Sequence, residues 1–412
     1  MASPTSQAVA AAAKEVANSA AKSATVFTAG SAAFQPRERY EASLSTTRSY
    51  FLGHHNAALN RMRQDIANVG LIIECRDFRV PLSSWNPLLE NSLAANPAER
   101  SRIIVYTKRD LGPAGRAYSA TGQTCRDVIR NLRAFHDEHK HAKHVMFLGR
   151  GDDFGSRQAS SSKQLLDAII RVAREADCLT GMRAMVVGMP NAGKSTLLNR
   201  LRARGMNLPK AAKTGANPGI TRKLGTPVRI ALGESSNAPG TRGLGEGVFL
   251  VDTPGVFVPY VAEAEDMLKL ALVGSVKDGV IPSVTVADYL LYHLNLVSPK
   301  LYTEKFGLDC PTNDVHEFLR AIGEKTGKLR KGNEPSLEAA AEWVVQDWRK
   351  GNLGRFLLDR VTPKTLEAKM AAIRDPAVSM NQARKAEKAA RKARIQAKFT
   401  GGLTPPIAGE SD

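Results

Sequence analysis

Short apolar runs alternate with amphipathic stretches from about residue 60 to about residue 275. The apolar runs are four or five residues long and rich in β-branched side chains, as in buried strands. They lie at residues 71–75 (LIIEC), 103–106 (IIVY), 145–148 (VMFL), 184–187 (AMVV), 228–231 (VRIA) and 248–251 (VFLV). Helix-like stretches fall between most of them, including residues 126–139 and 164–174. This alternation predicts an α/β fold with a doubly wound, mostly parallel sheet.

The pattern changes after about residue 282, where the strand-like runs stop. Apolar residues then recur at helical spacing in three stretches. These positions are Val286, Tyr289, Leu290, His293, Leu294 and Val297; Val315, Phe318, Leu319 and Ile322; and Leu337, Ala341, Val344, Val345 and Trp348. Ser336 suits the N-cap of the third helix, and Gly351 suits its end. A small α-helical domain therefore follows the α/β domain.

Both ends of the chain differ from the middle in composition. Residues 1–35 are rich in Ala, Ser and Thr and contain a single acid, which fits either an organelle transit segment or a disordered tail. Residues 350–400 carry 13 Lys and Arg against four Asp and Glu. We therefore expect an N-terminal segment at 1–48, an α/β domain at 49–275, a helical domain at 276–362 and a basic low-complexity tail at 363–412.

Charge and composition narrow the classes of partner. The 412 residues carry a formal net charge of +18, which favours nucleic acid, although a merely basic soluble protein also fits. Hydrophobic residues make up 43% of the chain, enough for a globular core. No run reaches the roughly 18 apolar residues of a membrane-spanning helix. The four cysteines have no metal-ligand spacing, so we expect them to be reduced.

A phosphate-binding motif follows the fourth apolar run. Residues 184–195 read AMVVGMPNAGKS, a strand that leads through Gly-x4-Gly-Lys-Ser into the helix-like TLLNRLRA. Between a strand and a helix this pattern predicts a P-loop, because backbone N–H groups at the helix N-terminus surround the phosphates. We expect Lys194 to reach the β- and γ-phosphates and Ser195 to ligate Mg²⁺. The nucleotide contacts expected from this loop are Asn191, Ala192, Gly193, Lys194, Ser195 and Thr196.

Two later motifs complete the phosphate side. Residues 249–255 read FLVDTPG, in which we expect Asp252 to hold Mg²⁺ and the Gly255 N–H to contact the γ-phosphate. Residues 218–221 read PGIT, which alone fits a turn equally well. Because PGIT lies between the other two motifs, Thr221 becomes the candidate second hydroxyl ligand of Mg²⁺. Its segment is expected to order when the γ-phosphate is present.

A base-recognition motif precedes the P-loop. Guanine differs from adenine in its N1–H and N2–H₂ groups, which a carboxylate accepts. The run TKRD follows the second apolar run, in the place of Asn-Lys-x-Asp. Asp110 is expected to read the base and Lys108 to cover its ring, while Thr107 replaces the usual Asn. TKRD alone is typical of a surface turn, but its position after a buried strand in a chain with a P-loop favours base recognition.

A second base-binding loop should follow the third apolar run. That places it near residues 149–152, with Gly149 as the candidate contact. Ser119 and Ala120 resemble the usual loop sequence but come too soon after Asp110. The motif order is thus base motif, base loop, P-loop, Thr segment and DTPG, a circular permutation of the usual GTPase order. Permutation keeps the sheet but connects the γ-phosphate motifs directly to the helical domain, which is well placed to respond to GTP.

Over about residues 50–358 the chain resembles the YlqF/RbgA family of circularly permuted GTPases, and within it the mitochondrial ribosome-associated GTPases. The matching blocks are FLGHHNAALNRM, LIIECRDFRVPLSSWNP, TKRD, GMPNAGKSTLLNRLR, NPGIT, VDTPGV, LALVGSVKD and AIGEKTGKL. The resemblance implies a slow, ribosome-stimulated GTPase that assembles the large ribosomal subunit and binds its rRNA. For the mitochondrial branch it implies the matrix, peripheral to the inner membrane. The alternatives are a nucleolar or cytosolic permuted GTPase and a GTP-stabilised RNA-binding module with little catalysis.

The resemblance also implies roles for single residues. Val256 stands where Ras-like proteins have a water-orienting Gln, so it cannot orient the attacking water. Asn191 takes the place of a K⁺ ligand, with a loop-bracing role as the alternative. His54, in FLGH, matches a histidine proposed to assist hydrolysis, and an RNA-contacting or structural histidine fits as well. With Lys194, Thr221 and Gly255, His54 completes the predicted catalytic set. Pro is replaced by Leu in FLGH, and CRDFR has Phe where the family has Ala.

Overall fold

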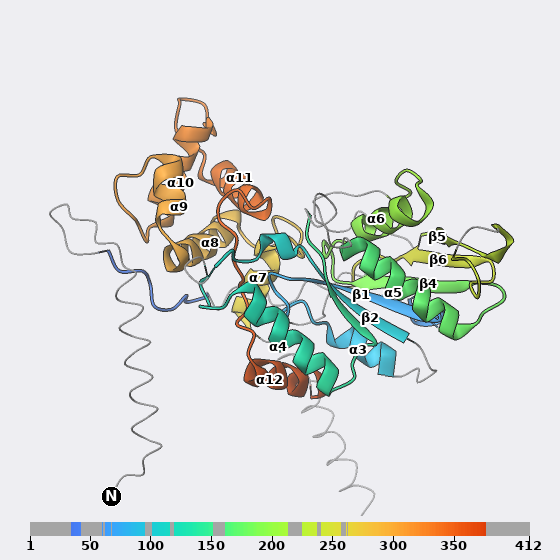
Figure 1. Ribbon diagram of the computed structural model, residues 1–412. Coiled ribbons are helices and arrows are strands. Elements are labelled where there is room, and N and C mark those ends of the chain that lie inside the picture. Colours follow the sequence, from blue (N-terminus) through green and yellow to red (C-terminus); the bar gives the residue numbers. More distant parts are fainter. Residues whose placement is uncertain are drawn as a thin grey trace, which may run out of the picture.

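A six-stranded sheet forms the centre of the molecule in this computed structural model (Figure 1). The strands run in the order β3–β2–β1–β4–β6–β5, and only β5 is antiparallel to its neighbour. They are β1 (Leu71–Asp77), β2 (Ser101–Thr107), β3 (His144–Phe147), β4 (Met182–Gly188), β5 (Val228–Leu232) and β6 (Gly247–Asp252). Each predicted strand coincides with one of these, which confirms the α/β fold class. The structure describes residues 34–42, 60, 62–66, 68–94, 101–115, 119–150, 161–212, 225–236, 240–256, 261 and 263–375.

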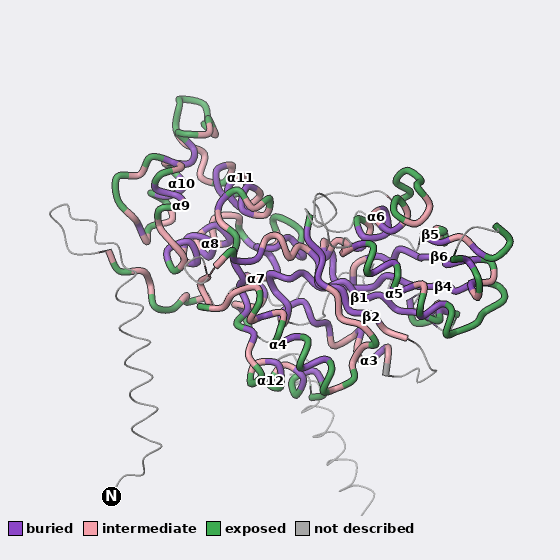
Figure 2. Tube along the Cα trace, in the orientation of Figure 1, coloured by how far each residue is buried: buried purple, intermediate pink, exposed green. Residues whose placement is uncertain are grey.

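Helices cover both faces of the sheet. Helices α5 (Ser161–Ala176) and α6 (Lys194–Met206) pack on one face, and α3 (Pro87–Ala94) and α4 (Cys125–Glu138) pack on the other. All seven residues of β1 are buried, as Figure 2 shows for the central strands. Burial on both faces explains why these strands read as continuous apolar runs without alternation.

The helical domain follows β6. Its helices are α7 (Ala264–Leu272), α8 (Ser283–Val297), α9 (Lys300–Phe306), α10 (Val315–Thr326) and α11 (Leu337–Arg349). Helix α7 lies before the expected boundary at residue 276, but its apolar residues belong to one core with α8, α10 and α11. The three predicted amphipathic helices coincide with α8, α10 and α11. Their apolar core also includes Val80 and Met189 of the α/β domain, so the two domains share one continuous core. Within the described part of the chain, none of the helices is long and apolar enough to span a membrane.

The chain returns to the α/β domain after α11. Residues 353–361 form a connecting strap in which Asp359, 3% exposed, accepts hydrogen bonds from the backbone N–H groups of Leu82 (2.9 Å) and Ser83 (2.8 Å). Helix α12 (Pro363–Arg374) then packs against α3 and α4. The first residues of the predicted basic tail are therefore folded; its end, after residue 375, lies outside the described residues.

Part of the predicted N-terminal segment lies against the helical domain. Arg37 binds the carboxylate of Asp288 at 2.8 Å, and the Tyr40 ring meets the Tyr289 ring edge-on, with centroids 4.9 Å apart. Residues 34–42 thus contact α8, although they precede the α/β domain in sequence (Figure 1).

Candidate functional site

The loop between β4 and α6 has the backbone of a phosphate-binding turn. Asn191 and Gly193 have positive φ angles of 55° and 86°, and α6 begins at the next residue, Lys194. The first N–H groups of a helix lack helical acceptors, and together with the helix dipole they favour an anion at this end. The sequence GMPNAGKS therefore folds into the strand–loop–helix arrangement that the P-loop motif requires.

Lys194 lies inside this loop. Its ammonium donates to the carbonyl oxygens of Gly188 (3.2 Å) and Met189 (2.8 Å), and the residue is only 6% exposed. Burial lowers the pKa of Lys194, while the nearby Asp252 and Cys75 oppose that change. A phosphate in the loop would give this buried ammonium an anionic partner.

Ser195 and Asp252 bring two oxygen ligands together at the edge of the loop. The Ser195 hydroxyl donates to Asp252 Oδ2 at 2.6 Å. Thr253 anchors the DTPG segment, because its hydroxyl donates to the Val186 carbonyl of β4 at 2.7 Å. A hydroxyl beside a carboxylate is the hard-oxygen donor set that Mg²⁺ prefers, so these residues fit the ion. Thr221, the other predicted ligand, lies outside the described residues.

The DTPG turn passes close to the phosphate loop. A Cβ atom on Gly255 would lie 2.5 Å from the Cα of Pro190, so this approach requires glycine. Val256 donates its N–H to Gly188 at 3.2 Å, and its fully buried side chain belongs to the apolar cluster with Val187. The side chain of Val256 thus packs in the core.

The base motif contacts the phosphate loop directly. At the end of β2 the Thr107 hydroxyl donates to the Ala192 carbonyl at 2.8 Å, so the residue that replaces Asn still braces the P-loop. Lys108, with a φ of 59°, donates from its ammonium to the Asn191 carbonyl (2.7 Å) and to Asp77 Oδ2 (2.9 Å). Base and phosphate motifs thus form one hydrogen-bonded unit.

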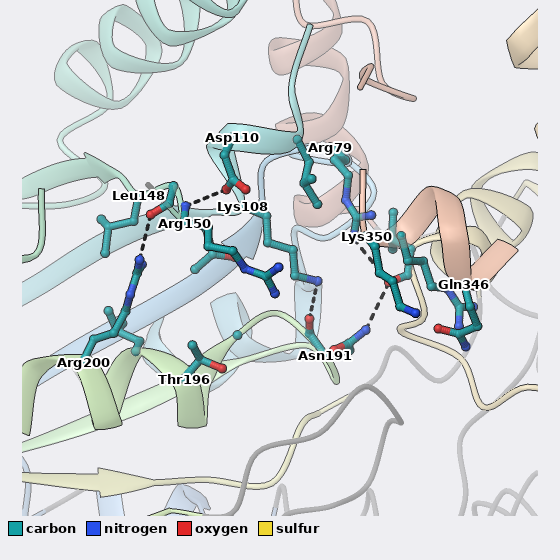
Figure 3. Close-up of a pocket in the computed structure, with 17 residues that line it drawn as sticks. Arg79, Lys108, Asp110, Leu148, Arg150, Asn191, Thr196, Arg200, Gln346 and Lys350 are labelled. Atoms are coloured by element: carbon teal, nitrogen blue, oxygen red, sulfur yellow. Dashed lines mark hydrogen bonds between the residues drawn. The ribbon is translucent and has the colours of Figure 1, made fainter. Parts of the chain in front are cut away.

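The loop after β3 lies beside the base motif. The Asp110 carboxylate accepts a hydrogen bond from the Arg150 N–H at 2.9 Å, and the Gly149 carbonyl accepts one from Arg200 of α6 at 2.9 Å (Figure 3). The structure therefore brings Gly149 to the same site as Asp110, where the second base-binding loop was predicted.

A cavity of about 410 Å³ joins these elements. Predicted residues that line it are Thr107, Lys108, Asp110, Gly149, Asn191, Gly193 and Thr196. Ala192, Lys194, Ser195, Asp252 and Gly255 form the adjoining phosphate side, and His54 lies outside the described residues.

Further lining residues were not named as candidate contacts, although one of them, Arg150, lies in the base loop predicted near residues 149–152. They are Arg79, Leu111, Leu148, Arg150, Leu197, Arg200, Val273, Gln346, Arg349 and Lys350. The matching blocks that contain Arg79 and Val273 were visible in the sequence, but nothing in them indicates a place at this cavity. Helix α11 gave no signal beyond its apolar face. Since Arg349 and Lys350 come from the helical domain, that domain forms one wall of the cavity.

Asp77 and Arg79 form a buried ionic cluster with Lys108 at the cavity. Arg79 binds Asp77 at 2.7 Å, and its guanidinium carbon lies 5.0 Å from the centre of the Trp348 ring of α11. Burial alone would raise the pKa of Asp77, but Arg79 and Lys108 outweigh it and hold this pKa far below its ordinary value. Burial lowers the pKa of Lys108 to about 8, against the attraction of Asp77.

Comparisons with known proteins show the family of this chain. Residues 183–306 match the family described as 50S ribosome-binding GTPase. "Mitochondrial GTPase 1" of Schizosaccharomyces japonicus is 36% identical over 330 residues, which cover 78% of this chain and 93% of the relative. The chain belongs to the mitochondrial GTPase 1 family. "Mitochondrial ribosome-associated GTPase 1" of Xenopus tropicalis is 32% identical over 323 residues, covering 75% and 94%. The GNP-bound YlqF structure from T. maritima is 21% identical, covers 73% of this chain and 97% of its own, and gives a TM-score of 0.42.

Membership of the mitochondrial GTPase 1 family confirms the family resemblance and the GTPase activity. GTP is the substrate, and Mg²⁺ is the ion that such sites hold. The match to the GTPase family begins at Arg183, in β4, and excludes the TKRD motif, which here comes earlier in the chain. This is the order expected of a circular permutation. The sheet nevertheless places Asp110 and the P-loop at one cavity, because β2 and β4 are both neighbours of β1.

Proposed function

We propose that this GTPase associates with the mitochondrial ribosome and acts in the assembly of its large subunit. It binds rRNA in the GTP state and thereby supports mitochondrial translation. The observation that carries the proposal is the shared cavity, which Gln346, Arg349 and Lys350 of the helical domain line together with the base motif. A domain in this position can respond to the bound nucleotide. The Xenopus tropicalis relative is named "Mitochondrial ribosome-associated GTPase 1", which supports the ribosomal part of the proposal.

Each site residue has a proposed role in the reaction. Asp110 accepts from guanine N1–H and N2–H₂, with Lys108 over the ring and Gly149 in the second base loop. Water attacks the γ-phosphorus and the bond to the β–γ bridging oxygen breaks, which gives GDP and phosphate. Lys194 and the Gly255 N–H stabilise the negative charge of the γ-phosphate oxygens in the transition state.

The remaining assignments concern cations and the attacking water. Ser195, Thr221 and Asp252 are the proposed Mg²⁺ ligands. The side chain of Asn191 is the proposed K⁺ ligand. His54 is the proposed general base or water-positioning residue, since Val256 packs in the core and has no polar atom for this task.

The proposed location is the mitochondrial matrix, peripheral to the inner membrane. Curated relatives from Schizosaccharomyces japonicus and Xenopus tropicalis carry "mitochondrial" in their names. Comparing the localisation of the full chain with that of a chain lacking residues 1–35 tests this. A nucleolar or cytosolic signal for the full chain would favour the alternative, a GTPase for the cytoplasmic ribosome.

Turnover measurements test the proposed function. GTP hydrolysis should rise when mitochondrial large subunits are added, and it should rise again when KCl replaces NaCl at constant ionic strength. Lys194→Ala is the control for contaminating hydrolysis, because it removes the phosphate-binding ammonium. No stimulation by the large subunits would contradict the ribosomal role. No difference between the two salts would contradict only the K⁺ assignment.

The basic tail provides a separate test of RNA binding. Deletion of residues 381–398 removes seven Lys and Arg. Because cationic side chains release counterions from RNA, affinity should fall and its dependence on salt concentration should flatten. The measurement is a salt titration of binding to a large-subunit rRNA fragment, with intrinsic GTP hydrolysis as the control for folding. Unchanged affinity would exclude the tail from the RNA interface.

A further inference from the structure

The turn between α7 and α8 lies directly against the phosphate loop. Asn191 Nδ2 donates to the Val273 carbonyl at 3.2 Å, and Arg79 Nη2 lies 3.4 Å from the same oxygen. The next residue, Gly274, has a φ of 81°. A Cβ atom on Gly274 would lie 2.8 Å from Asn191 Nδ2 and 3.2 Å from the Arg349 guanidinium carbon. Only glycine therefore fits between the phosphate loop and α11.

Arg349 holds this turn in place. Its Nε donates to the Leu272 carbonyl at 2.9 Å, and its Nη2 donates to the Ala271 carbonyl at 2.8 Å. Carbonyls in the last turn of a helix lack helical donors, so the guanidinium caps the end of α7. Asp278 binds the same guanidinium at 3.0 Å, and the Arg349 side chain is only 9% exposed. The last residue of α11 is thus tied to the turn that contacts Asn191.

The contact is reinforced by packing on the other side of the loop. Met189, two residues before Asn191, is 1% exposed and belongs to the apolar core of the helical domain. Val273 belongs to the same core. The block LALVGSVKD, which spans residues 270–278, therefore supplies both the capped carbonyls and the turn. The phosphate loop and the helical domain cannot move apart without breaking these contacts.

We propose that Val273, Gly274 and Arg349 are positioning residues for GTP hydrolysis, because they hold the side-chain amide of Asn191 in one orientation. A hydrogen bond to the amide nitrogen also sets the direction of the amide oxygen, as an outer-shell partner orients a ligand atom. A movement of α11 would then change the phosphate loop and with it the rate. The proposal rests on the proposed role of the Asn191 side chain in hydrolysis and does not require the ribosome.

A double-mutant cycle tests the proposal. Intrinsic kcat and KM for GTP and the urea midpoint are measured for the wild type, Asn191→Ala, Arg349→Ala and the double variant, without ribosomes and at one KCl concentration. Because small displacements of a catalytic group are costly, Arg349→Ala should lower kcat about tenfold or more and change KM little. In the Asn191→Ala background it should lower kcat no further, while its effect on the urea midpoint persists. Independent, multiplicative effects on kcat would overturn the proposal, as would a wild-type kcat for Asn191→Ala.

Two further variants separate positioning from loss of structure. The methyl group added by Gly274→Ala would lie 2.8 Å from Asn191 Nδ2 and would displace the amide. The folded variant should therefore also lose kcat, and a wild-type kcat would contradict the proposal. Arg330→Ala is the matched control on the same domain, because Arg330 pairs only with Glu338, at 3.5 Å on the exposed surface, among the described residues. It should leave kcat, KM and the urea midpoint unchanged. Loss of kcat in this control would show that any damage to the helical domain slows hydrolysis, which would overturn the specific role of Arg349.

Discussion

Two buried ionic clusters built on β1 show how one strand serves both stability and binding. The sealed cluster contains Glu74, Arg76, Glu90 and Arg102, between the sheet and α3. The pocket cluster contains Asp77, Arg79 and Lys108, at the carboxyl end of the same strand. Guanidinium groups hold the pKa of the buried carboxylates Glu74 and Asp77 far below the ordinary range, although burial alone would raise both values. The two clusters therefore share their chemistry and differ in where they lie.

The sealed cluster balances its own charge. Arg76 binds Glu74 at 2.7 Å, Arg102 donates to both carboxylates, and Trp85 donates to Glu90 at 2.5 Å. Two carboxylates face two guanidinium groups, so no net charge remains.

The pocket cluster has one carboxylate against two cations and opens onto the cavity. Its surplus positive charge adds to that of Arg150 on the cavity wall, which favours a triphosphate. The sealed cluster, whose charges balance, thus stabilises the fold. The pocket cluster has surplus positive charge and favours an anionic ligand in the cavity.

Removing one partner from the sealed cluster should give the largest effect on stability. Glu74→Ala leaves Arg76 and Arg102 with Glu90 as their one remaining carboxylate in the cluster, and removing one partner from a buried ion pair typically costs about 3–5 kcal/mol. Urea unfolding measures this loss, and the affinity of the folded variant for labelled GDP should stay within about twofold of the wild type because the cluster does not reach the cavity. A stability loss below about 1 kcal/mol would show that water replaces the missing carboxylate.

The same truncation in the pocket cluster should have the opposite profile. Asp77→Ala releases the buried Arg79 guanidinium and the Lys108 ammonium, and water in the cavity can compensate for Lys108, whose side chain is 24% exposed. We expect a smaller loss of stability, about 1–3 kcal/mol, and a roughly tenfold loss of GDP affinity because Lys108 is no longer held against the Asn191 carbonyl. Measuring both quantities for Glu74→Ala and Asp77→Ala in parallel tests the comparison. Equal losses of affinity in the two variants would refute it.

The sequence predicted the parts of this site that follow from local pattern. Burial on both faces makes each strand an apolar run, and the P-loop and TKRD have fixed spacing because they bind fixed atoms of one ligand. The contacts of Arg349 and Asp359 could not be predicted in this way. Both side chains bind backbone groups that are more than 70 residues away in the sequence. Because every residue carries such backbone groups, the sequence does not indicate which of them a side chain binds.

Composition misled the prediction at helix α12. It was expected as basic tail because residues 350–400, which include it, carry 13 Lys and Arg against four Asp and Glu. Its apolar residues Leu366, Met370 and Ile373 nevertheless recur at helical spacing and pack in one cluster with Leu132 of α4, so periodicity, rather than charge, indicates the helix.

Acid should weaken the region of the sealed cluster. The buried His136 meets the Tyr106 hydroxyl at 2.9 Å, and burial, reinforced by Arg76, lowers the pKa of His136 from 6.5 to about 2. The unfolded chain therefore binds more protons between these values, so the stabilising contribution is complete above pH 6.5 and declines as the pH falls. His136→Gln should reduce the slope of unfolding free energy against pH between 5 and 6 by about 1.4 kcal/mol per unit. An unchanged slope would show that His136 is protonated in the folded protein.

Alkali should weaken nucleotide binding through the pocket cluster, with the smallest of these effects. Lys108 has its pKa lowered to about 8 without nucleotide, and the negative phosphates should raise that pKa when GDP is bound. Binding then takes up a proton above pH 8, so GDP affinity should fall by about threefold between pH 8 and 9. Lys108→Met keeps an apolar stem but cannot titrate, and its weaker affinity should show no such decline. If the decline persisted in Lys108→Met, another group would titrate, and the surplus charge of the pocket cluster would not come from Lys108.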